Sequence, residues 1–318
     1  MMSDRRRIVI LGKTGAGKSS LANTIFGEEL FKISHDPNSE TRKCQANTKS
    51  VNGRSITLID TPGFSWFDTD RSEEELKPEI VRCITECAPG PHAFLIVLKV
   101  ERFTEQEQAV INKIQEYFSE ESFRNATVVF TYGDELPGGE TIEDFVLKNK
   151  PLDDLVKKCG GRCHNEYRSN QFQVEELLKT IDKMVTASNG RYYTNEMLQA
   201  VEEKIQQEEE TIRSLSGNLS GEEIRKKAKG NVFKRFINRL AGFGTGALLG
   251  ALFGAAGVLA KVSTDLRPVP MLANTIQAKD RAAVLTSAAA GAVRGGTVFN
   301  LFLLRLCGST IPNQWCTV

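Results

Sequence analysis

Residues 12–19 carry the sequence Gly-Lys-Thr-Gly-Ala-Gly-Lys-Ser, and this stretch decides the fold. It follows the apolar run at residues 8–11 and precedes residues 20–26, whose apolar side chains recur at helical spacing. The pattern G-x-x-x-x-G-K-[ST] between a strand and a helix is typical of a phosphate-binding loop. It predicts an α/β fold in which this loop follows the first strand of a mostly parallel sheet.

The residue types explain how such a loop holds phosphate. Glycines let the backbone turn so that successive N–H groups point inward, and the helix start adds a partial positive charge. Lys18 is expected to reach the β- and γ-phosphates, and the Ser19 hydroxyl to ligate Mg²⁺. A glycine-rich turn without a ligand is the alternative, which the complete match disfavours. The predicted nucleotide-binding residues here are Gly12, Lys13, Thr14, Gly15, Ala16, Gly17, Lys18, Ser19 and Ser20.

A second motif follows a predicted hairpin. Asn52-Gly53 separates two alternating runs, which predicts a two-residue β-turn and one antiparallel edge strand. The second run leads directly into Asp60-Thr61-Pro62-Gly63. An Asp at a strand's carboxyl end beside the phosphate loop can hold Mg²⁺ through water, and the Gly63 amide can meet the γ-phosphate.

A nucleotide-dependent switch also needs a segment that senses the γ-phosphate. The polar residues 32–48 are predicted to form that loop, and Thr41 is the candidate Mg²⁺ ligand through its hydroxyl. Thr48 is the competitor, although the hairpin prediction places it in a strand. A solvent-exposed loop threonine is the third interpretation of Thr41.

The buried run at residues 126–131 predicts a strand that ends in Thr131-Tyr132-Gly133-Asp134. A carboxylate at this place accepts hydrogen bonds from N1–H and the exocyclic amino group of guanine, a donor pair that adenine lacks. The sequence therefore predicts GTP and GDP as ligands, with Mg²⁺. The usual form of this motif is [NT]-K-x-D, and here Tyr132 stands in place of the lysine.

Composition limits the classes of protein that the chain can represent. The 318 residues are 25% charged and 40% hydrophobic, which is typical of globular proteins. The formal net charge of +1 disfavours nucleic-acid binding through bulk charge. Seven cysteines at irregular spacing disfavour a disulfide scaffold and favour a reducing intracellular compartment. No signal peptide is expected, because only a short apolar run follows the basic N-terminus.

The C-terminal third changes character twice. Residues 196–230 are charged and predicted helical, and residues 225–239 combine basic with apolar side chains at helical spacing, a pattern suited to anionic lipid. Residues 240–260 carry no charge, and residues 282–304 carry only Arg294. Both stretches approach the length of about 20 residues that a membrane span needs. The alternative is a Gly/Ala-rich helix buried in a soluble protein.

These patterns divide the chain into three predicted parts. Residues 1–205 form a nucleotide-binding domain, residues 206–239 a charged and then basic helical linker, and residues 240–318 a hydrophobic, membrane-associated region. The basic residues before the first span predict that the nucleotide domain faces the cytosol at an intracellular membrane; a cytoplasmic protein is the alternative.

With these motifs in place, residues 5 to about 205 resemble the GTPases of immunity-associated proteins, which are related to septins and plastid-translocon receptors. The phosphate loop and the Asp60–Gly63 motif carry the resemblance, together with a diagnostic box at residues 82–104 that includes Ala88-Pro89-Gly90-Pro91-His92. The resemblance implies a three-layer Ras-like GTPase domain and GTP-dependent self-association as a dimer or oligomer. It also implies that Thr41 is the switch threonine and that Asn165 contacts guanine.

Hydrolysis is expected to be slow. Ras-type enzymes orient water with a Gln just after the D-x-x-G motif, and Phe64 and Ser65 occupy that region here. The resemblance implies a remedy, because Arg102 matches an arginine that acts across a dimer in some members; a solvated loop arginine is the alternative. The predicted function is a GTP/GDP switch with slow, dimerisation-dependent hydrolysis at a membrane surface. The rival is an oligomeric GTP-binding membrane scaffold that does not hydrolyse.

Overall fold

The computed structural model describes residues 5–33, 44–61, 73–165, 171–215 and 218–240 of the chain; for residues 73–77, 116–117, 171 and 239–240 it describes the backbone only. These residues belong to one compact unit that runs to Ala241. Thr41, Gly63 and, apart from Leu240, both predicted membrane spans lie outside the described residues. Among the helices that are described, none combines the length and apolarity needed to cross a bilayer.

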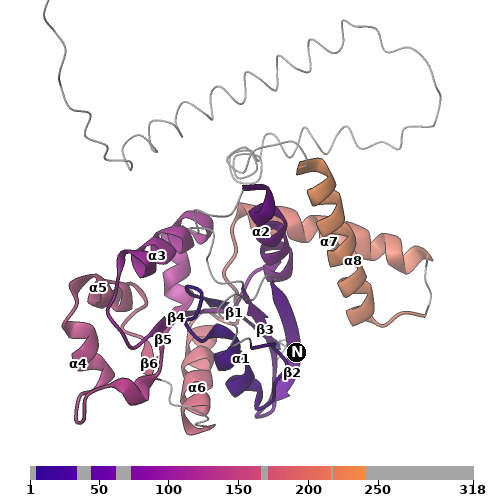
Figure 1. The fold of residues 1–318 in the computed structure, drawn as a ribbon. Helices are drawn as coiled ribbons and strands as arrows, with labels where there is room; N and C mark the ends of the chain where they lie inside the picture. The colour runs from indigo at the N-terminus through magenta and orange to yellow at the C-terminus, as the bar shows by residue number, and fades with distance from the viewer. Residues whose placement is uncertain (1–4, 34–43, 62–72, 166–170, 216–217, 241–318) are drawn as a thin grey trace, which may run out of the picture. The chain divides into compact units, whose positions relative to one another are not determined.

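Strands and helices alternate along part of the chain, apart from the consecutive strands β2 and β3 and the consecutive helices α4–α5 and α6–α8 (Figure 1). The strands are β1 (Arg5–Leu11), β2 (Gln45–Val51), β3 (Arg54–Asp60), β4 (Ala93–Lys99), β5 (Ala126–Thr131) and β6 (Cys163–Asn165). The α-helices are α1 (Lys18–Phe26), α2 (Glu73–Cys87), α3 (Glu105–Phe118), α4 (Ile142–Leu147), α5 (Lys150–Lys158), α6 (Gln171–Ala187), α7 (Glu196–Leu215) and α8 (Gly221–Leu240). Short 3₁₀ helices lie at η2 (Glu120–Asn125) and η3 (Gly133–Glu135).

The described strands form one sheet in the order β2-β3-β1-β4-β5-β6. Only β2 runs antiparallel, joined to β3 through the Asn52-Gly53 turn, and the other neighbouring pairs are parallel. The predicted mostly parallel sheet with one antiparallel edge strand is confirmed. Parallel strands place their carboxyl ends at one edge, which is where ligands bind in such sheets.

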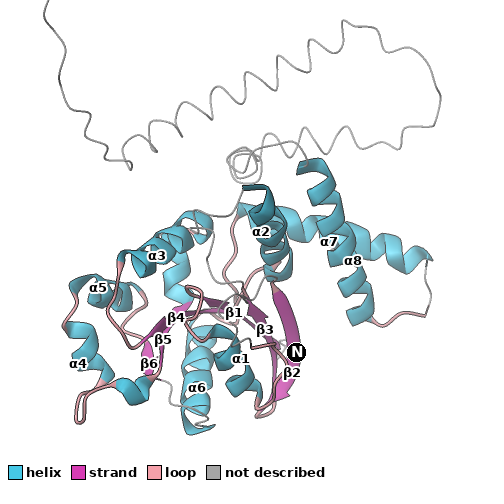
Figure 2. Ribbon diagram, viewed as in Figure 1, coloured by secondary structure: helices cyan, strands magenta, loops and turns pink. Residues whose placement is uncertain are grey.

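Helices cover both faces of the sheet (Figure 2). On one face, Ile8 and Ile10 of β1 join a buried cluster with Leu21 of α1 and Ile181 of α6. On the other face, Phe94 of β4 packs against Phe118 of α3 with ring centres 5.1 Å apart and against Tyr193 at 5.4 Å. Burial of a side chain of this size contributes about 1.5–3 kcal/mol, so the two layers supply the core that holds the loops at the sheet edge.

Local sequence signals account for most of the helix boundaries. Thr104 caps α3 and forms the predicted capping box with Glu107. Gly27 ends α1 in the left-handed conformation. The helix α4 was missed by sequence reasoning, although Thr141 and Asp144 form a capping box at its start. Its 6 residues are too few to show a helical period.

The segment at residues 88–92, from the box that is most diagnostic of the family resemblance, lies at the amino end of β4, away from the phosphate loop. Arg7 Nε donates a hydrogen bond to Gly90 O (2.8 Å), and Tyr193 N donates one to Pro91 O (2.8 Å). A Cβ on Gly90 would lie 1.8 Å from Tyr193 O, so only glycine fits there. This part of the box therefore anchors the chain that leads into α7 and contributes no group to the phosphate loop.

The predicted lipid-binding helix packs against the rest of the unit through part of its apolar side. The side chains of Ile224, Ala228 and Val232 on α8 are buried, and Arg82 of α2 lies 4.4 Å from the ring centre of Phe233. The contact with α2 and α7 therefore buries the apolar side of α8 in part, whereas Phe236 and Ile237 stay partly exposed.

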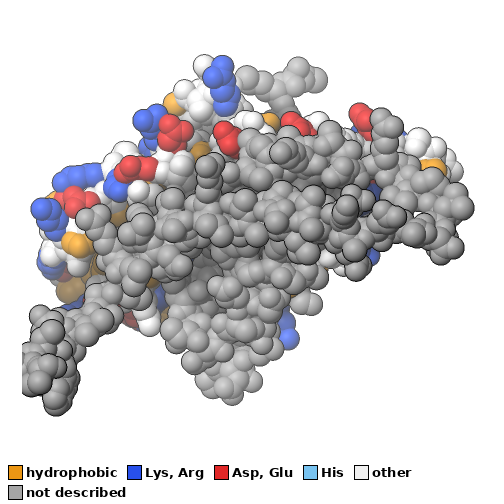
Figure 3. Space-filling model, turned by 90° about the horizontal axis from the view of Figure 1, so that it is seen from above, with side chains coloured by type: hydrophobic (Ala, Val, Ile, Leu, Met, Phe, Trp, Pro, Cys, Tyr) orange, Lys and Arg blue, Asp and Glu red, His pale blue; other side chains and the backbone are white. Residues whose placement is uncertain are grey.

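Several basic residues of α8 are paired in the same contact. Arg225 bonds Glu202 (2.7 Å) and Glu209 (2.8 Å) of α7, and Lys229 bonds Glu86 of α2 (3.1 Å). The exposed basic residues of α8 include Lys226, Lys227 and Lys234. On the described part of the face seen in Figure 3, basic and acidic side chains are interspersed, in keeping with the near-zero net charge.

Candidate nucleotide-binding site

The carboxyl ends of β1, β4 and β5 bring three segments together. We call residues 12–17 the phosphate loop, residues 99–101 the bridge segment and residues 131–135 the base loop. Thr131 Oγ1 donates a hydrogen bond to Ala16 O (2.9 Å), which joins the base loop to the phosphate loop. Because β4 lies between β1 and β5, the bridge segment emerges between the other two.

The phosphate loop keeps its shape through close backbone approaches. Gly12 has φ +155°, and a Cβ at this position would lie 2.4 Å from Val97 O. Gly17 has φ +86° and precedes α1 without any side-chain cap on the helix start. The positive end of the helix dipole therefore lies at the phosphate loop, where it favours an anion.

The lysine and the serine of the motif both make hydrogen bonds to neighbouring parts of the site. The Lys18 side chain is buried, and its Nζ donates a hydrogen bond to Lys13 O across the loop (2.8 Å). Ser19 Oγ donates a hydrogen bond to Asp60 Oδ2 (2.6 Å), which joins the start of α1 to the end of β3. Residues 41 positions apart in sequence thus meet where the sequence predicts a Mg²⁺ site.

Asp60 is fully buried, and its second carboxylate oxygen, Oδ1, has no hydrogen-bond partner among the described residues. Burial raises the pKa of this carboxyl, and the Ser19 hydrogen bond and the Lys18 charge oppose the rise. A buried oxygen without a partner is costly. The hydroxyl and carboxylate oxygens here are ligands that suit Mg²⁺, so Ser19 and Asp60 fit the predicted metal.

Lys13 of the phosphate loop is held by two acids from outside the loop. Its Nζ lies 2.6 Å from Glu101 Oε1 of the bridge segment and also bonds the buried carboxylate of Glu107 in α3. Burial alone would lower the pKa of Lys13, but the hydrogen bonds from the two carboxylates outweigh it and raise the pKa. Sequence reasoning assigned Lys13 only to the loop backbone, because no local pattern indicates these partners.

The base loop combines an exposed carboxylate with two constrained neighbours. Asp134 is exposed, and Tyr132 adopts φ +59°, which is uncommon for a residue with a side chain. Lys99 Nζ of the bridge segment lies 4.6 Å from the centre of the Tyr132 ring. A Cβ on Gly133 would lie 1.9 Å from Asn165 Oδ1, so the predicted guanine-contacting asparagine is adjacent to the base loop.

The remaining predicted residues divide into two groups. Thr14, Gly15 and Ser20 are exposed around the phosphate loop, and Arg102 is exposed just after the bridge segment. Thr41 and Gly63 lie outside the described residues. The structure therefore brings together the phosphate loop, Asp60, the base loop and Asn165, while the γ-phosphate-sensing part of the prediction stays a prediction.

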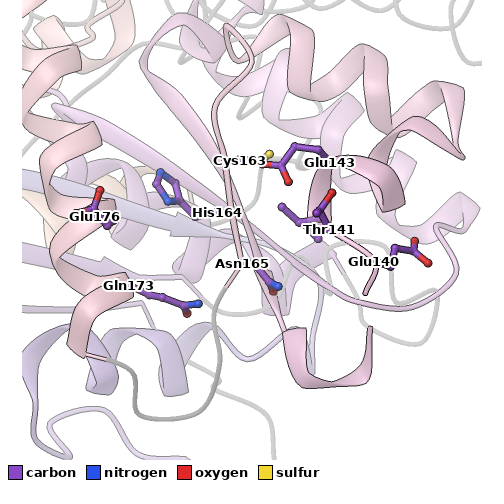
Figure 4. A pocket seen from close by; sticks show the side chains of 9 residues that line it. Glu140, Thr141, Glu143, Cys163, His164, Asn165, Gln173 and Glu176 are labelled. Atoms are coloured by element: carbon purple, nitrogen blue, oxygen red, sulfur yellow. The ribbon is translucent and has the colours of Figure 1, made fainter. Parts of the chain in front are cut away.

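A cavity of about 400 Å³ adjoins Asn165 beside β6 (Figure 4). Its walls come from α4, β6, α6 and the residues before α4, so no single stretch of sequence predicts it. Burial lowers the pKa of His164, whose Nε2 lies 3.0 Å from Thr180 Oγ1, and raises the pKa of Cys163 to about 11. The lining residues are Glu140, Thr141, Ile142, Glu143, Cys163, His164, Asn165, Gln173 and Glu176.

The family model described as the AIG1 family matches residues 6–213. The chain belongs to the AIG1 family. The predicted resemblance is thereby confirmed, and the matched range takes in the whole sheet and most of α7.

Relatives of this AIG1-family chain occur in plants and animals. Immune-associated nucleotide-binding protein 4 of Arabidopsis thaliana is 33% identical over 230 residues, which cover 69% of each chain. GTPase IMAP family member 8 of Homo sapiens is 33% identical over 195 residues, which are 59% of this chain but only 29% of the human protein.

Solved structures match the chain at lower sequence identity. Toc33 from Arabidopsis thaliana in complex with Mg²⁺ and GMPPNP matches this AIG1-family chain with a TM-score of 0.45 and 21% identity, over 59% of this chain and 87% of that one. Toc33 in complex with GDP and Mg²⁺ matches with a TM-score of 0.44 and 20% identity, over 59% of this chain and 86% of that one.

Proposed function

We propose that this protein is a guanine-nucleotide switch that binds GTP and GDP with Mg²⁺ and hydrolyses GTP slowly. The observation that carries the proposal is the pair Ser19–Asp60 at 2.6 Å beside an uncapped helix start, with one buried carboxylate oxygen left over. The helix start suits the phosphates, and the two side chains suit the cation that accompanies them.

The choice of purine is assigned to Asp134. Its carboxylate is exposed at the carboxyl edge of the sheet, at the end of β5 and next to Gly133 and Asn165. A carboxylate accepts from the two donors of guanine and meets no such pair on adenine, so binding of adenine would leave it unsatisfied. Guanine nucleotides are therefore favoured over ATP.

The cation would be held by Ser19 and Asp60, with Thr41 as a third predicted ligand. When bound, Mg²⁺ neutralises charge on the phosphate oxygens. Lys18 contributes a second positive charge: its ammonium group donates to Lys13 O, 2.8 Å away, and has further N–H donors that can meet a phosphate. The Ser19 hydroxyl can keep donating its proton to Asp60 Oδ2, because its oxygen retains lone pairs that can face the cation.

Hydrolysis is proposed to depend on dimerisation. Arg102 is exposed on the segment between β4 and α3 and lies next to Glu101, which bonds the phosphate loop. An arginine in this place can enter the site of a second copy of the chain, where such a residue raises the rate by about 10³–10⁵. The rival function, an oligomeric GTP-binding scaffold without turnover, predicts no hydrolysis in a single-turnover assay at high protein concentration.

We also propose that the protein acts at a membrane surface. This proposal is supported by the uncharged sequence at residues 240–260 and by exposed lysines on α8 such as Lys226, Lys227 and Lys234. Confinement to a surface raises the effective concentration of a dimerising domain. The proposed site of action is the cytosolic face of an intracellular membrane; flotation of the full chain with anionic liposomes tests this part independently.

The decisive experiment measures the thermal melting temperature with Mg²⁺ and GTP, GDP or ATP. At a ligand concentration of about 100 Kd, binding adds about 2.7 kcal/mol to the free energy of unfolding, so a clear rise in Tm is expected with GTP and GDP. Asp134→Ala should remove the preference for guanine nucleotides, whereas Asp154→Ala on the exposed side of α5 serves as the control. A wild-type protein whose Tm ignores all three nucleotides would refute the proposed function.

A further inference from the structure

The bridge segment lies between the phosphate loop and the base loop and is bonded to both. Val100 N donates a hydrogen bond to Thr131 O (2.9 Å), so its backbone is fixed to the base loop. Glu101 Oε1 lies 2.6 Å from Lys13 Nζ, so its side chain is fixed to the phosphate loop. The segment thus links the two loops that would hold the two ends of a nucleotide.

A second link runs through Lys99, the last residue of β4. Its ammonium group lies 4.6 Å from the centre of the Tyr132 ring, which is a cation–π distance. The same ammonium lies 3.8 Å from Glu101 Oε2 and 3.8 Å from Glu135 Oε2. Charges of alternating sign therefore run from Lys13 through Glu101 and Lys99 to Glu135, with Tyr132 beside them.

Tyr132, which lies beside these charges, stands where the usual guanine-binding motif has a lysine. Guanine-binding motifs of the form [NT]-K-x-D carry a lysine where this sequence has Tyr132. Tyr132 takes up the left-handed conformation and supplies no positive charge of its own. Lys99 brings an ammonium group from the neighbouring strand to 4.6 Å from the centre of the Tyr132 ring.

We propose that Lys99 and Glu101 are positioning residues for the guanine nucleotide, which replace the missing motif lysine by fixing the base loop to the phosphate loop. The inference rests on the proposed function, because it concerns how this site binds guanine nucleotides. A ligand that spans both loops gains affinity when their spacing is set before it binds, since less ordering remains to be done on binding. A ligand that touches only the phosphate loop gains nothing from that spacing.

The substitution Glu101→Gln separates positioning from simple electrostatics by the sign of its effect. It removes a negative charge next to the phosphate loop, and by Coulomb's law alone this tightens the binding of any polyphosphate. Loss of the bridge has the opposite effect on a nucleotide that spans both loops. Glu105→Gln makes the same charge change on an exposed residue at the start of α3 and is the matched control.

The experiment measures the Kd of the Mg²⁺ complexes of GDP and of inorganic triphosphate for the full chain by calorimetry. For Glu101→Gln we expect GDP binding about two- to fivefold weaker, the effect of losing the two partly exposed ion pairs with Lys13 and Lys99. Triphosphate should bind as tightly as to the wild type, or more tightly. Lys99→Met combined with Glu101→Gln should weaken GDP binding by less than the product of the two single effects, because both belong to one bridge.

The outcomes separate this inference from the function on which it rests. If Glu101→Gln binds GDP as well as the wild type does, or loses affinity for triphosphate equally, the positioning role is overturned. If the wild type itself binds no guanine nucleotide, the proposed function is overturned first. A thermal melt of each variant without ligand shows whether it is folded, so that a loss of structure is not taken for a loss of positioning.

Discussion

Ser19 and Asp60 meet across 2.6 Å between Oγ and Oδ2, and the other oxygen of Asp60 is buried without a hydrogen-bond partner in the described part of the chain. The serine begins a helix and the aspartate ends a strand, so the contact joins two layers of the fold at the edge where the phosphate loop lies. A buried carboxylate with an unpartnered oxygen destabilises the protein unless a cation binds to it.

Asp60→Asn should therefore stabilise the protein without ligand and weaken binding of the Mg²⁺–nucleotide complex. Burial raises the pKa of Asp60, so its ionisation disfavours the folded state as pH rises through the folded pKa, and the neutral amide removes that cost at pH 7. We expect a higher Tm without nucleotide and about 10–100-fold weaker binding of Mg²⁺–GDP, the range found when groups around a metal are replaced. A lower Tm without nucleotide, with unchanged affinity, would contradict this account.

Gly133→Ala should damage the base end of the site selectively. The added methyl group would lie 1.9 Å from Asn165 Oδ1, so the base loop or the end of β6 must move. Overpacking of this kind costs about 1–3 kcal/mol, and we expect GDP affinity to fall about tenfold or more while binding of inorganic triphosphate is retained. In Gly133→Ala/Asn165→Ala the clash is gone, so Tm should recover; recovery of full GDP affinity as well would exclude a role for Asn165 in binding.

The free energy of unfolding should depend on pH in part through the titration of His92. This residue is buried, its Nδ1 accepts a hydrogen bond from Arg7 N (3.0 Å), and burial with the nearby Arg7 and Arg6 charges lowers its pKa to about 4. The unfolded chain binds the proton near pH 6.5, and the folded chain binds it only near pH 4. The contribution of neutral His92 to the free energy of unfolding is therefore complete above pH 6.5 and is lost as pH falls to about 4. The loss amounts to about 3 kcal/mol.

The variant that checks this is His92→Asn, whose carbonyl oxygen can accept the same hydrogen bond but does not titrate. Urea unfolding at pH 7, 6, 5 and 4 should show a flatter decline in the free energy of unfolding for the variant than for the wild type. Parallel declines for the two proteins would show that other groups govern this pH range.

Much of the fold could be predicted because its signals are local. The Asn52-Gly53 dipeptide predicted the hairpin, and the apolar run at residues 93–98 predicted a central strand. The capping box of Thr104 and Glu107 predicted the start of α3. These elements depend on turn chemistry, hydrophobic patterning and capping, which neighbouring residues determine. The pairing of Ser19 with Asp60 also followed, because a known motif fixes both ends.

The parts that the sequence did not predict depend on contacts between distant residues. Nothing near Lys13 indicates that Glu101 and Glu107 will meet it, because the approach of β1 and β4 brings them together. The apolar and basic pattern of α8 is the same for a helix on lipid and for a helix on protein. In the structure α8 packs against α2, where Lys229 pairs with Glu86, while Phe236 and Ile237 stay partly exposed, so lipid binding by α8 stays a prediction.

Arg225→Met should release α8 without impairing the nucleotide site. The arginine bonds Glu202 and Glu209, and its Nη2 also donates a hydrogen bond to Ala88 O (3.2 Å). Among the described residues, its removal leaves Glu202 only the hydrogen bond from Gln206 and Glu209 only the ion pair with Arg213 at 3.8 Å, a change that costs about 1–3 kcal/mol. We expect faster amide hydrogen exchange in α7 and α8 with unchanged GDP affinity. Lys226→Met, on the exposed side of α8, is the control and should leave exchange unchanged.

Arg102→Ala should abolish the dependence of GTP hydrolysis on protein concentration. Arg102 is exposed, and its neighbour Glu101 is bonded to the phosphate loop, so its side chain is available to a second copy of the chain that docks at this edge. If the arginine acts in trans, specific activity of the wild type rises with protein concentration, and removal of the side chain lowers the high-concentration rate by about 10³ or more. GDP affinity should stay the same, because the residue does not contribute to its own chain's site.

A mixing experiment makes this prediction specific to a contact between copies. A Lys18→Ala chain should bind phosphate poorly but still carries Arg102, whereas Arg102→Ala retains its phosphate loop. Mixed together, the two inactive variants should restore part of the hydrolysis, since each dimer of unlike chains then holds one intact site that faces one intact arginine. If the mixture stays inactive although the chains associate, Arg102 does not act across the dimer, and slow turnover must be explained within a single chain.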